Sequence, residues 1–183
     1  ATLLSFVAGL VNITGLLALK TLTTNVTGHF AYFAEEMMKH EYSAAITFLV
    51  FTLFFLFGSF LSSFLEELIS IRNPQLSHLF PITLEMFILI AIGFFGTNLG
   101  LGSFGGKLTA FFLLFAMGIQ NSLVTNISKS IVRTTHLTGL FTDLGIELSQ
   151  LFFYRKPEEV KKLKTSIYLR LSIITFFFIG CFS

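Results

Sequence analysis

The sequence is poor in charge, in proline and in cysteine. Its 183 residues include one cysteine, three prolines and no tryptophan, and only 12% are Asp, Glu, Lys or Arg. A single cysteine, Cys181, excludes an intramolecular disulfide and a thiolate metal cage. A net charge of +2 is too small to favour a nucleic-acid partner.

Enzyme signatures are also missing. The chain has no His-x-x-x-His pair, no Gly-x-Ser-x-Gly phrase and no dinucleotide glycine pattern. The stretch GLGSFGGK (100–107) lacks the Gly-Lys-Ser/Thr ending of a phosphate loop, so that we interpret it as a turn. The sequence therefore predicts neither an enzyme nor a bound cofactor or metal.

Most of the sequence is apolar. Of all residues, 54% are hydrophobic, 25 are Phe, and the mean hydropathy is +0.81. The runs 48–61 and 86–96 are apolar on every face, which is typical of helices surrounded by lipid. A soluble domain of this length would have to expose much of this surface to water. We predict an all-α, polytopic membrane protein.

Breaks in the apolar pattern divide the chain into helical segments. The breaks are Asn73-Pro74, Pro81, the glycine-rich stretch 100–107 and the charged stretch 155–164, which we interpret as a solvated loop with a helix start after Pro157. Seven segments are expected, at about 2–19, 25–40, 43–71, 81–101, 107–127, 136–154 and 165–183.

Three blocks of sequence occur twice, in the same order. FVAGLVN (6–12) resembles FAMGIQN (115–121), TTNVTGHF (23–30) resembles TTHLTGLF (134–141), and FFLFGSF (54–60) resembles FFFIGCF (176–182). This order predicts one transmembrane domain that contains repeat one (2–71), a connector helix (81–101) and repeat two (107–183). Because Ser183 corresponds to Leu61, we expect the second copy to continue beyond Ser183.

The middle segment of each copy determines the topology. Segment 25–40 has only about 13 fairly apolar residues, fewer than the roughly 20 that a crossing requires. If neither middle segment spans, the copies are inverted and nine basic residues share one side against three. If both span, the copies are parallel and the split is eight to four. The positive-inside rule favours the inverted repeat and places 155–164 in the cytoplasm.

The duplicated TTxxTG phrase predicts a helix start inside the membrane. Thr and Asn cap helices, and Gly lets a backbone approach closely. A buried helix start is tolerated where protein or a water-filled cavity covers it, and it presents positive partial charge to a ligand. Inverted copies would bring two such starts together near the midplane, as in many secondary transporters. The alternative is close helix packing through small residues.

Polar residues around the two phrases complete the predicted site. We expect substrate contacts from Asn12, Thr24, Thr27, Gly28, His29, Gln120, Asn121, Arg133, Thr135, Thr138 and Gly139. Carboxylates one or two turns further on, Glu36, Asp143 and Glu147, are candidates for proton coupling because carboxylates are costly in lipid. The alternative for these acids is a solvated stripe on an interfacial helix. Glu85 is interpreted as a snorkelling interfacial residue.

The same motifs resemble a known family. AGLVN, TTNVTGHF and MGIQNSLV…VRTTHLTGLFTDLG are similar to the YoaK-like family of small bacterial multi-spanning proteins, over about residues 6–150. In the second copy Gln120, Asn121, Arg133, Thr134, Thr135, Thr138, Gly139, Asp143 and Leu144 match its pattern. In the first copy Asn12 stands where the family has Asp, and His29 replaces Asn. The resemblance implies an inner-membrane protein, proposed to be a small-molecule permease without a known substrate.

These observations together predict the passage of a small polar or anionic solute through a midplane site. The alternative is a non-transporting subunit that docks on a larger membrane complex through the Gly58/Ser62 and Ser59/Ser63 pairs. Expected partners are the lipid bilayer and a small solute, and a homo-oligomer or a larger membrane complex remains open. The expected location is the bacterial inner membrane.

Overall fold

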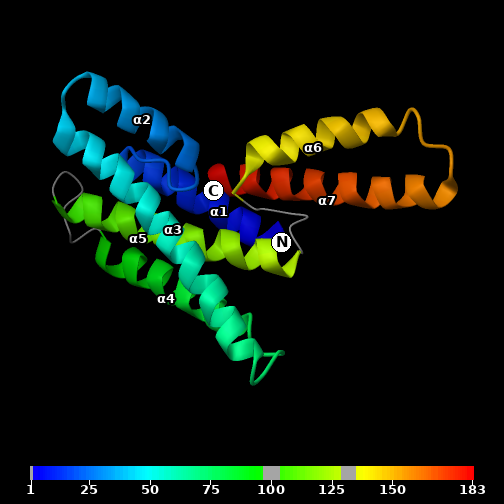
Figure 1. Cartoon of the computed structure of the whole chain (residues 1–183), viewed down its shortest axis with the longest axis horizontal. Coiled ribbons are helices and arrows are strands. Elements are labelled where there is room, and N and C mark those ends of the chain that lie inside the picture. Colours follow the sequence, from blue (N-terminus) through cyan, green and yellow to red (C-terminus); the bar gives the residue numbers. More distant parts are fainter. Residues whose placement is uncertain (1, 97–103, 129–134) are drawn as a thin grey trace.

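The computed structural model describes residues 2–96, 104–128 and 135–183. These residues form helices and connecting turns, with no strand among them. The helices are α1 (Thr2–Leu19), α2 (Val26–Met38), α3 (Tyr42–Ser70), α4 (Leu79–Phe95), α5 (Phe104–Ile127), α6 (Leu137–Gln150) and α7 (Pro157–Cys181) (Figure 1). The predicted all-helical class is confirmed.

Helix length separates membrane-crossing from shorter elements. By length and composition α1, α3, α5 and α7 are long and apolar enough to cross a membrane, and α4 is a shorter apolar helix of 17 residues. With 13 and 14 residues, α2 and α6 are about 20 Å long, well below the roughly 30 Å of a hydrocarbon core. The chain is therefore a helical membrane protein in which the middle helix of each copy is a half-length helix.

Each long outer helix packs against a helix of the other copy: α1 lies along α7, and α3 lies along α5. Four glycines permit this approach, because a Cβ atom on any of them would clash with a carbonyl oxygen of the opposite helix. They are Gly9 and Gly180 in the α1–α7 pair, and Gly58 and Gly118 in the α3–α5 pair.

Side-chain hydrogen bonds give the direction of both pairs. Cys181 Sγ donates to Gly9 O at 3.4 Å and Ser5 Oγ donates to Ile173 O at 2.8 Å, so that α1 and α7 are parallel. In the other pair Ser59 Oγ donates to Gly118 O at 3.0 Å, and the hydroxyls of Ser63 and Ser122 lie 2.9 Å apart. That pair is parallel too. Because α5 and α7 run in opposite directions in Figure 1, α1 is antiparallel to its counterpart α5, and the repeat is inverted.

The small residues of α3 pack against another helix of the same chain. Gly58, Ser59 and Ser63 all contact α5, and Ser62 is buried. They are therefore not a free surface for a larger complex. The helix α5 lies at the centre of the protein. In its most apolar stretch of 18 residues 67% of the residues are buried, against 17% in the corresponding stretch of α3.

Two boundaries differ from the sequence prediction. The helix α7 begins at Pro157, where the sequence predicts a helix start, and not at about 165, where the last segment was expected to begin, so that most of the 155–164 stretch is helical. Proline at the first position and Glu158 and Glu159 in the first turn explain this early start. The helix α6 ends at Gln150 instead of 154, and α6 and α7 form a hairpin that extends away from the other helices (Figure 1).

Candidate functional site

After α1 the chain folds back along the helix that it has just left. Lys20 takes a left-handed conformation (φ 55°) and reverses the chain. Thr23 then lies against Gly15, whose missing side chain makes room for the Thr23 methyl group, and Thr23 Oγ1 donates to Val11 O at 3.3 Å. The start of α2 is thereby placed beside the middle of α1, inside the bundle.

One threonine–asparagine hydrogen bond anchors each fold-back segment. Thr24 Oγ1 donates to Asn12 Oδ1 at 2.9 Å, and in the second copy Thr135 Oγ1 donates to Asn121 Oδ1 at 2.9 Å. These four residues occupy equivalent positions in the two repeats. The matched asparagines thus fix the two half-length helices to the middle of the crossing helices.

The two helix starts face a common cavity of about 710 Å³. Phe55 and Phe177, which are equivalent in the repeat, line it from α3 and α7. Seven of the predicted contact residues line it: Asn12, Thr24, Thr27, Gly28, Asn121, Thr135 and Thr138. Apolar side chains, among them Leu22, Val26 and Leu137, complete the lining, so that the cavity between the two helix starts is partly polar.

The two starts are capped differently. Asn25 caps α2, because its Oδ1 accepts a hydrogen bond from Gly28 N at 2.9 Å. His136 holds the equivalent position before α6 and makes no capping hydrogen bond with its side chain. The first N–H groups of α6 are therefore less satisfied within the protein than those of α2, and His136 lines the cavity beside them.

The glycines of the phrase do not serve helix packing. The nearest atoms to a Cβ atom at Gly28 would belong to the Asn25 side chain, and those to a Cβ atom at Gly139 would belong to the His136 ring. Backbone of another helix, which crowds Gly9, Gly58, Gly118 and Gly180, is not among these neighbours. This difference favours the site interpretation of TTxxTG over the packing interpretation.

Some predicted contact residues lie elsewhere. His29 is buried, with Nε2 2.7 Å from Leu22 O and its ring against Phe48 and Phe51. Gln120 is fully buried, and its Nε2 donates to Leu4 O at 2.6 Å, which ties α5 to α1. Gly139 does not line the cavity itself. Arg133 lies outside the described residues.

The candidate proton-coupling acids are all in ion pairs. Arg170 of α7 places Nη1 2.7 Å from Asp143 Oδ2 and Nε 3.0 Å from Glu147 Oε2. Ser166 Oγ donates to the other oxygen of Glu147 at 2.6 Å. Glu36 lies 3.0 Å from Lys39 Nζ at the exposed end of α2.

Sequence reasoning missed two charged residues that matter in the fold. Arg170 counted only toward topology, although it is the one cation within the apolar part of α7, which was a signal that it needs an anionic partner. Glu85 is not the predicted snorkelling residue: only 2% of it is exposed, because its face of α4 is covered by protein.

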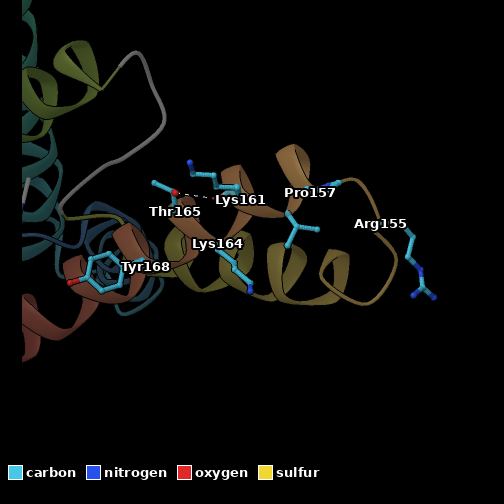
Figure 2. A pocket seen from close by; sticks show the side chains of 7 residues that line it. Arg155, Pro157, Lys161, Lys164, Thr165 and Tyr168 are labelled. Carbon is cyan, nitrogen blue, oxygen red and sulfur yellow. Dashed lines mark hydrogen bonds between the residues drawn. The ribbon is translucent and has the colours of Figure 1, made fainter.

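A second hollow, of about 690 Å³, lies at the end of the α6–α7 hairpin. It is lined by Arg155, Lys161 and Lys164 among others, but Figure 2 shows the two lysines pointing to different sides of α7, with Arg155 remote from both. The cations do not converge on one point. This surface is therefore a weaker candidate for solute binding than the central cavity.

Comparison with known proteins gives one match. The family model described as "Protein of unknown function (DUF1275)" matches residues 1–183. No curated protein and no solved structure matches the chain.

Proposed function

We propose that this chain, which belongs to the DUF1275 family of proteins of unknown function, is a permease for a small polar or anionic solute. The solute would bind in the central cavity, between the starts of α2 and α6. The observation that carries the proposal is the meeting of two half-length helices, N-terminus toward N-terminus, at one partly polar cavity inside an inverted repeat.

The chemistry of the lining supports an anion or a neutral polar solute. Among the described lining residues no Lys, Arg, Asp or Glu occurs, and the polar groups are Asn and Thr side chains with His136. Positive potential would come from the two helix dipoles and the free N–H groups of α6. Binding through partial charges is weaker than binding through a buried cation, which suits a site that must release its solute.

The size of the cavity also agrees with this role. A volume of about 710 Å³ lies in the usual range for small-molecule sites, roughly 300–1,000 Å³. The pseudo-symmetric lining by Phe55 and Phe177 would suit access from either side in turn, because equivalent side chains of the two copies flank the site.

We place the protein in the bacterial inner membrane. Seven described basic residues lie toward the end of the bundle where α3 ends and α7 begins: Arg72, Arg155, Lys156, Lys161, Lys162, Lys164 and Arg170. Lys20, Lys39 and Lys107 lie toward the other end. The excess would make the first end, with residues 155–164, the cytoplasmic one.

Flux measurements in proteoliposomes test the proposal. We would follow uptake of formate, acetate, sulfate and neutral glycerol, with Thr138→Val and Thr135→Val as site variants. Thr142→Val is a matched control, since Thr142 is exposed on α6 and donates only to Thr138 O at 2.9 Å. We expect flux of at least one solute, reduced about tenfold by the site variants, as for one lost hydrogen bond.

Two results would contradict the proposal. One is the absence of flux for all four solutes in protein that is folded and reconstituted. The other is equal flux in Thr135→Val, Thr138→Val and the Thr142→Val control, which would mean that the solute does not pass the cavity.

A further inference from the structure

One buried acid of the chain lacks the partners that every candidate proton-coupling acid has. Glu85, in the second turn of α4, is only 2% exposed, and neither of its carboxyl oxygens has a hydrogen-bond partner among the described residues. By contrast Asp143 and Glu147 are paired with Arg170, and Glu36 is paired with Lys39. Glu85 is therefore a buried acid without an ion pair, unlike the three acids that the sequence analysis proposes for proton coupling.

Among the residues that the structure describes, no cation of the neighbouring helices is paired with Glu85. The helix α4 packs on α5 and α3. The only ionisable residue of α5, Lys107, lies in its first turn, next to the far end of α4, where Ile92 and Phe95 share a hollow with Leu108. From α3 the titratable neighbour on the buried side is another acid, Glu66, which is 6% exposed.

An ionised carboxylate in this position would be strongly unfavourable. Burial of an unpaired charge costs several kcal/mol even after the protein relaxes, and the group becomes neutral instead. A protonated carboxyl avoids that cost and retains one donor and one acceptor. The burial of Glu85 without a cation thus requires that the group hold a proton in this conformation.

Along α4 the titratable group nearest to Glu85 in sequence is His78, directly before the first turn of the helix. His78, Pro81 and Glu85 are spaced three and four residues apart and so share one face of α4, over about 10 Å. The side chain of His78 is 46% exposed, and its Nδ1 lies 3.7 Å from Glu66 Oε1. Glu66 Oε2 accepts a hydrogen bond from Asn126 Nδ2 at 2.7 Å, which leaves Oε1 toward His78.

We propose that Glu85 is a proton-binding site, which exchanges its proton with water at the end of the bundle where His78 lies. In the exchange, water at the exposed His78 end supplies one proton, and the carboxylate of Glu85 becomes a carboxylic acid. The reverse sequence returns the proton. No other bond forms or breaks.

This site goes beyond the proposed permease function and does not depend on the central cavity. If solute flux is proton-coupled, Glu85 supplies the coupling group that Glu36, Asp143 and Glu147 cannot easily supply while they are ion-paired. If the protein moves no solute, the proton site still exists and is detected without any solute.

Infrared spectroscopy tests the site directly. The purified protein, near neutral pH in a maltoside detergent without carbonyl groups, should show the C=O stretching band of one neutral carboxyl. The band should vanish in Glu85→Gln and remain in the matched control Glu66→Gln. In D₂O it should shift, and His78→Ala should slow that shift several-fold.

The proposal is overturned if the wild type lacks the band, or if the band survives in Glu85→Gln. Loss of the band in Glu66→Gln alone would assign the proton to Glu66 and also refute the proposal. Should Glu85→Gln fail to fold, Glu85→Asp serves instead: the band must then change its frequency, and an unchanged band counts against Glu85.

Discussion

The two half-length helices are equivalent in sequence position but are held to the bundle by opposite chemistry. In the first copy, the Tyr32 ring of α2 stacks on Phe48 of α3, with centroids 5.1 Å apart. In the second copy, the equivalent positions are Asp143 of α6 and Arg170 of α7, whose charged atoms lie 2.7 Å apart. An aromatic stack in one copy is replaced by an ion pair in the other.

This replacement has a physical consequence. Aromatic contacts hold α2 along α3 with no charge to compensate, and His29 extends the same stack toward Phe51. The helix α6 depends on a cation that must serve both Asp143 and Glu147. Since α6 also lacks the side-chain cap of α2, we infer that the second copy is the less firmly held half of the site.

The largest effect should come from the part of the fold that the two copies share. Gly118→Leu would drive a side chain into the Phe55 carbonyl, and we expect a loss of more than about 4 kcal/mol or failure to fold. Gly139→Leu displaces only the exposed His136 ring and should leave the fold intact. Thermal stability in detergent compares the two. Equal losses would mean that the TTxxTG glycine is also a packing residue.

The next effect concerns the ion pair that distinguishes the second copy. Arg170→Phe leaves Asp143 and Glu147 without a cation, and we expect a loss of about 3 kcal/mol in stability. Adding Asp143→Tyr recreates the Tyr32–Phe48 pair of the first copy, and adding Glu147→Gln removes the remaining unpaired charge, so that the two changes together should recover most of that loss. Denaturation of the single and triple variants measures the free energy of unfolding of each. No recovery in the triple variant would refute the proposed equivalence.

A smaller effect is expected from exchanging the caps. His136→Asn supplies α6 with the cap that Asn25 gives α2, which should stabilise the protein by about 1 kcal/mol and weaken solute binding at the α6 start. Asn25→Ala should destabilise α2 by a similar amount. Stability and solute flux would be measured together. If His136→Asn raises stability and leaves flux unchanged, the α6 start does not contact the solute.

The smallest effect is expected at the exposed end of α2. The hydrogen bonds of Lys39 with Glu35, and then with Glu36, raise the pKa of Lys39 above that of an ordinary lysine. Because a raised lysine pKa adds stability that is lost only as pH rises through that pKa, Glu36→Gln should not alter the pH dependence of flux near neutral pH. Asp143→Asn should alter this pH dependence more, because Asp143 shares the Arg170 cation with Glu147. Flux profiles against pH distinguish the two variants, and a larger change in Glu36→Gln would reverse this order.

The sequence predicts the helical class, the short middle segments and the meeting of the two phrases, because these depend on local composition and on the repeat. It does not predict that α1 packs on α7, since Gly9 and Gly58 would fit equally well against each other within one copy. The Arg170 triad was missed because its members are 23 and 27 residues apart, and only the fold brings them together. The burial of Glu85 depends on which face of α4 meets α5, which an almost uniformly apolar helix does not reveal.

The central claim is that one cavity is shared by the starts of α2 and α6. Thr27→Cys can be labelled with a small hydrophilic thiol reagent, in a Cys181→Ser background that keeps a donor for Gly9 O, as Ser59 does for Gly118 O. The labelling rate would be compared between chains that carry Thr138 and chains that carry Thr138→Trp. We predict ready labelling with Thr138, and labelling at least about tenfold slower when the indole fills the cavity from the other copy. Equal rates in the two chains, or no labelling in either, would contradict the account.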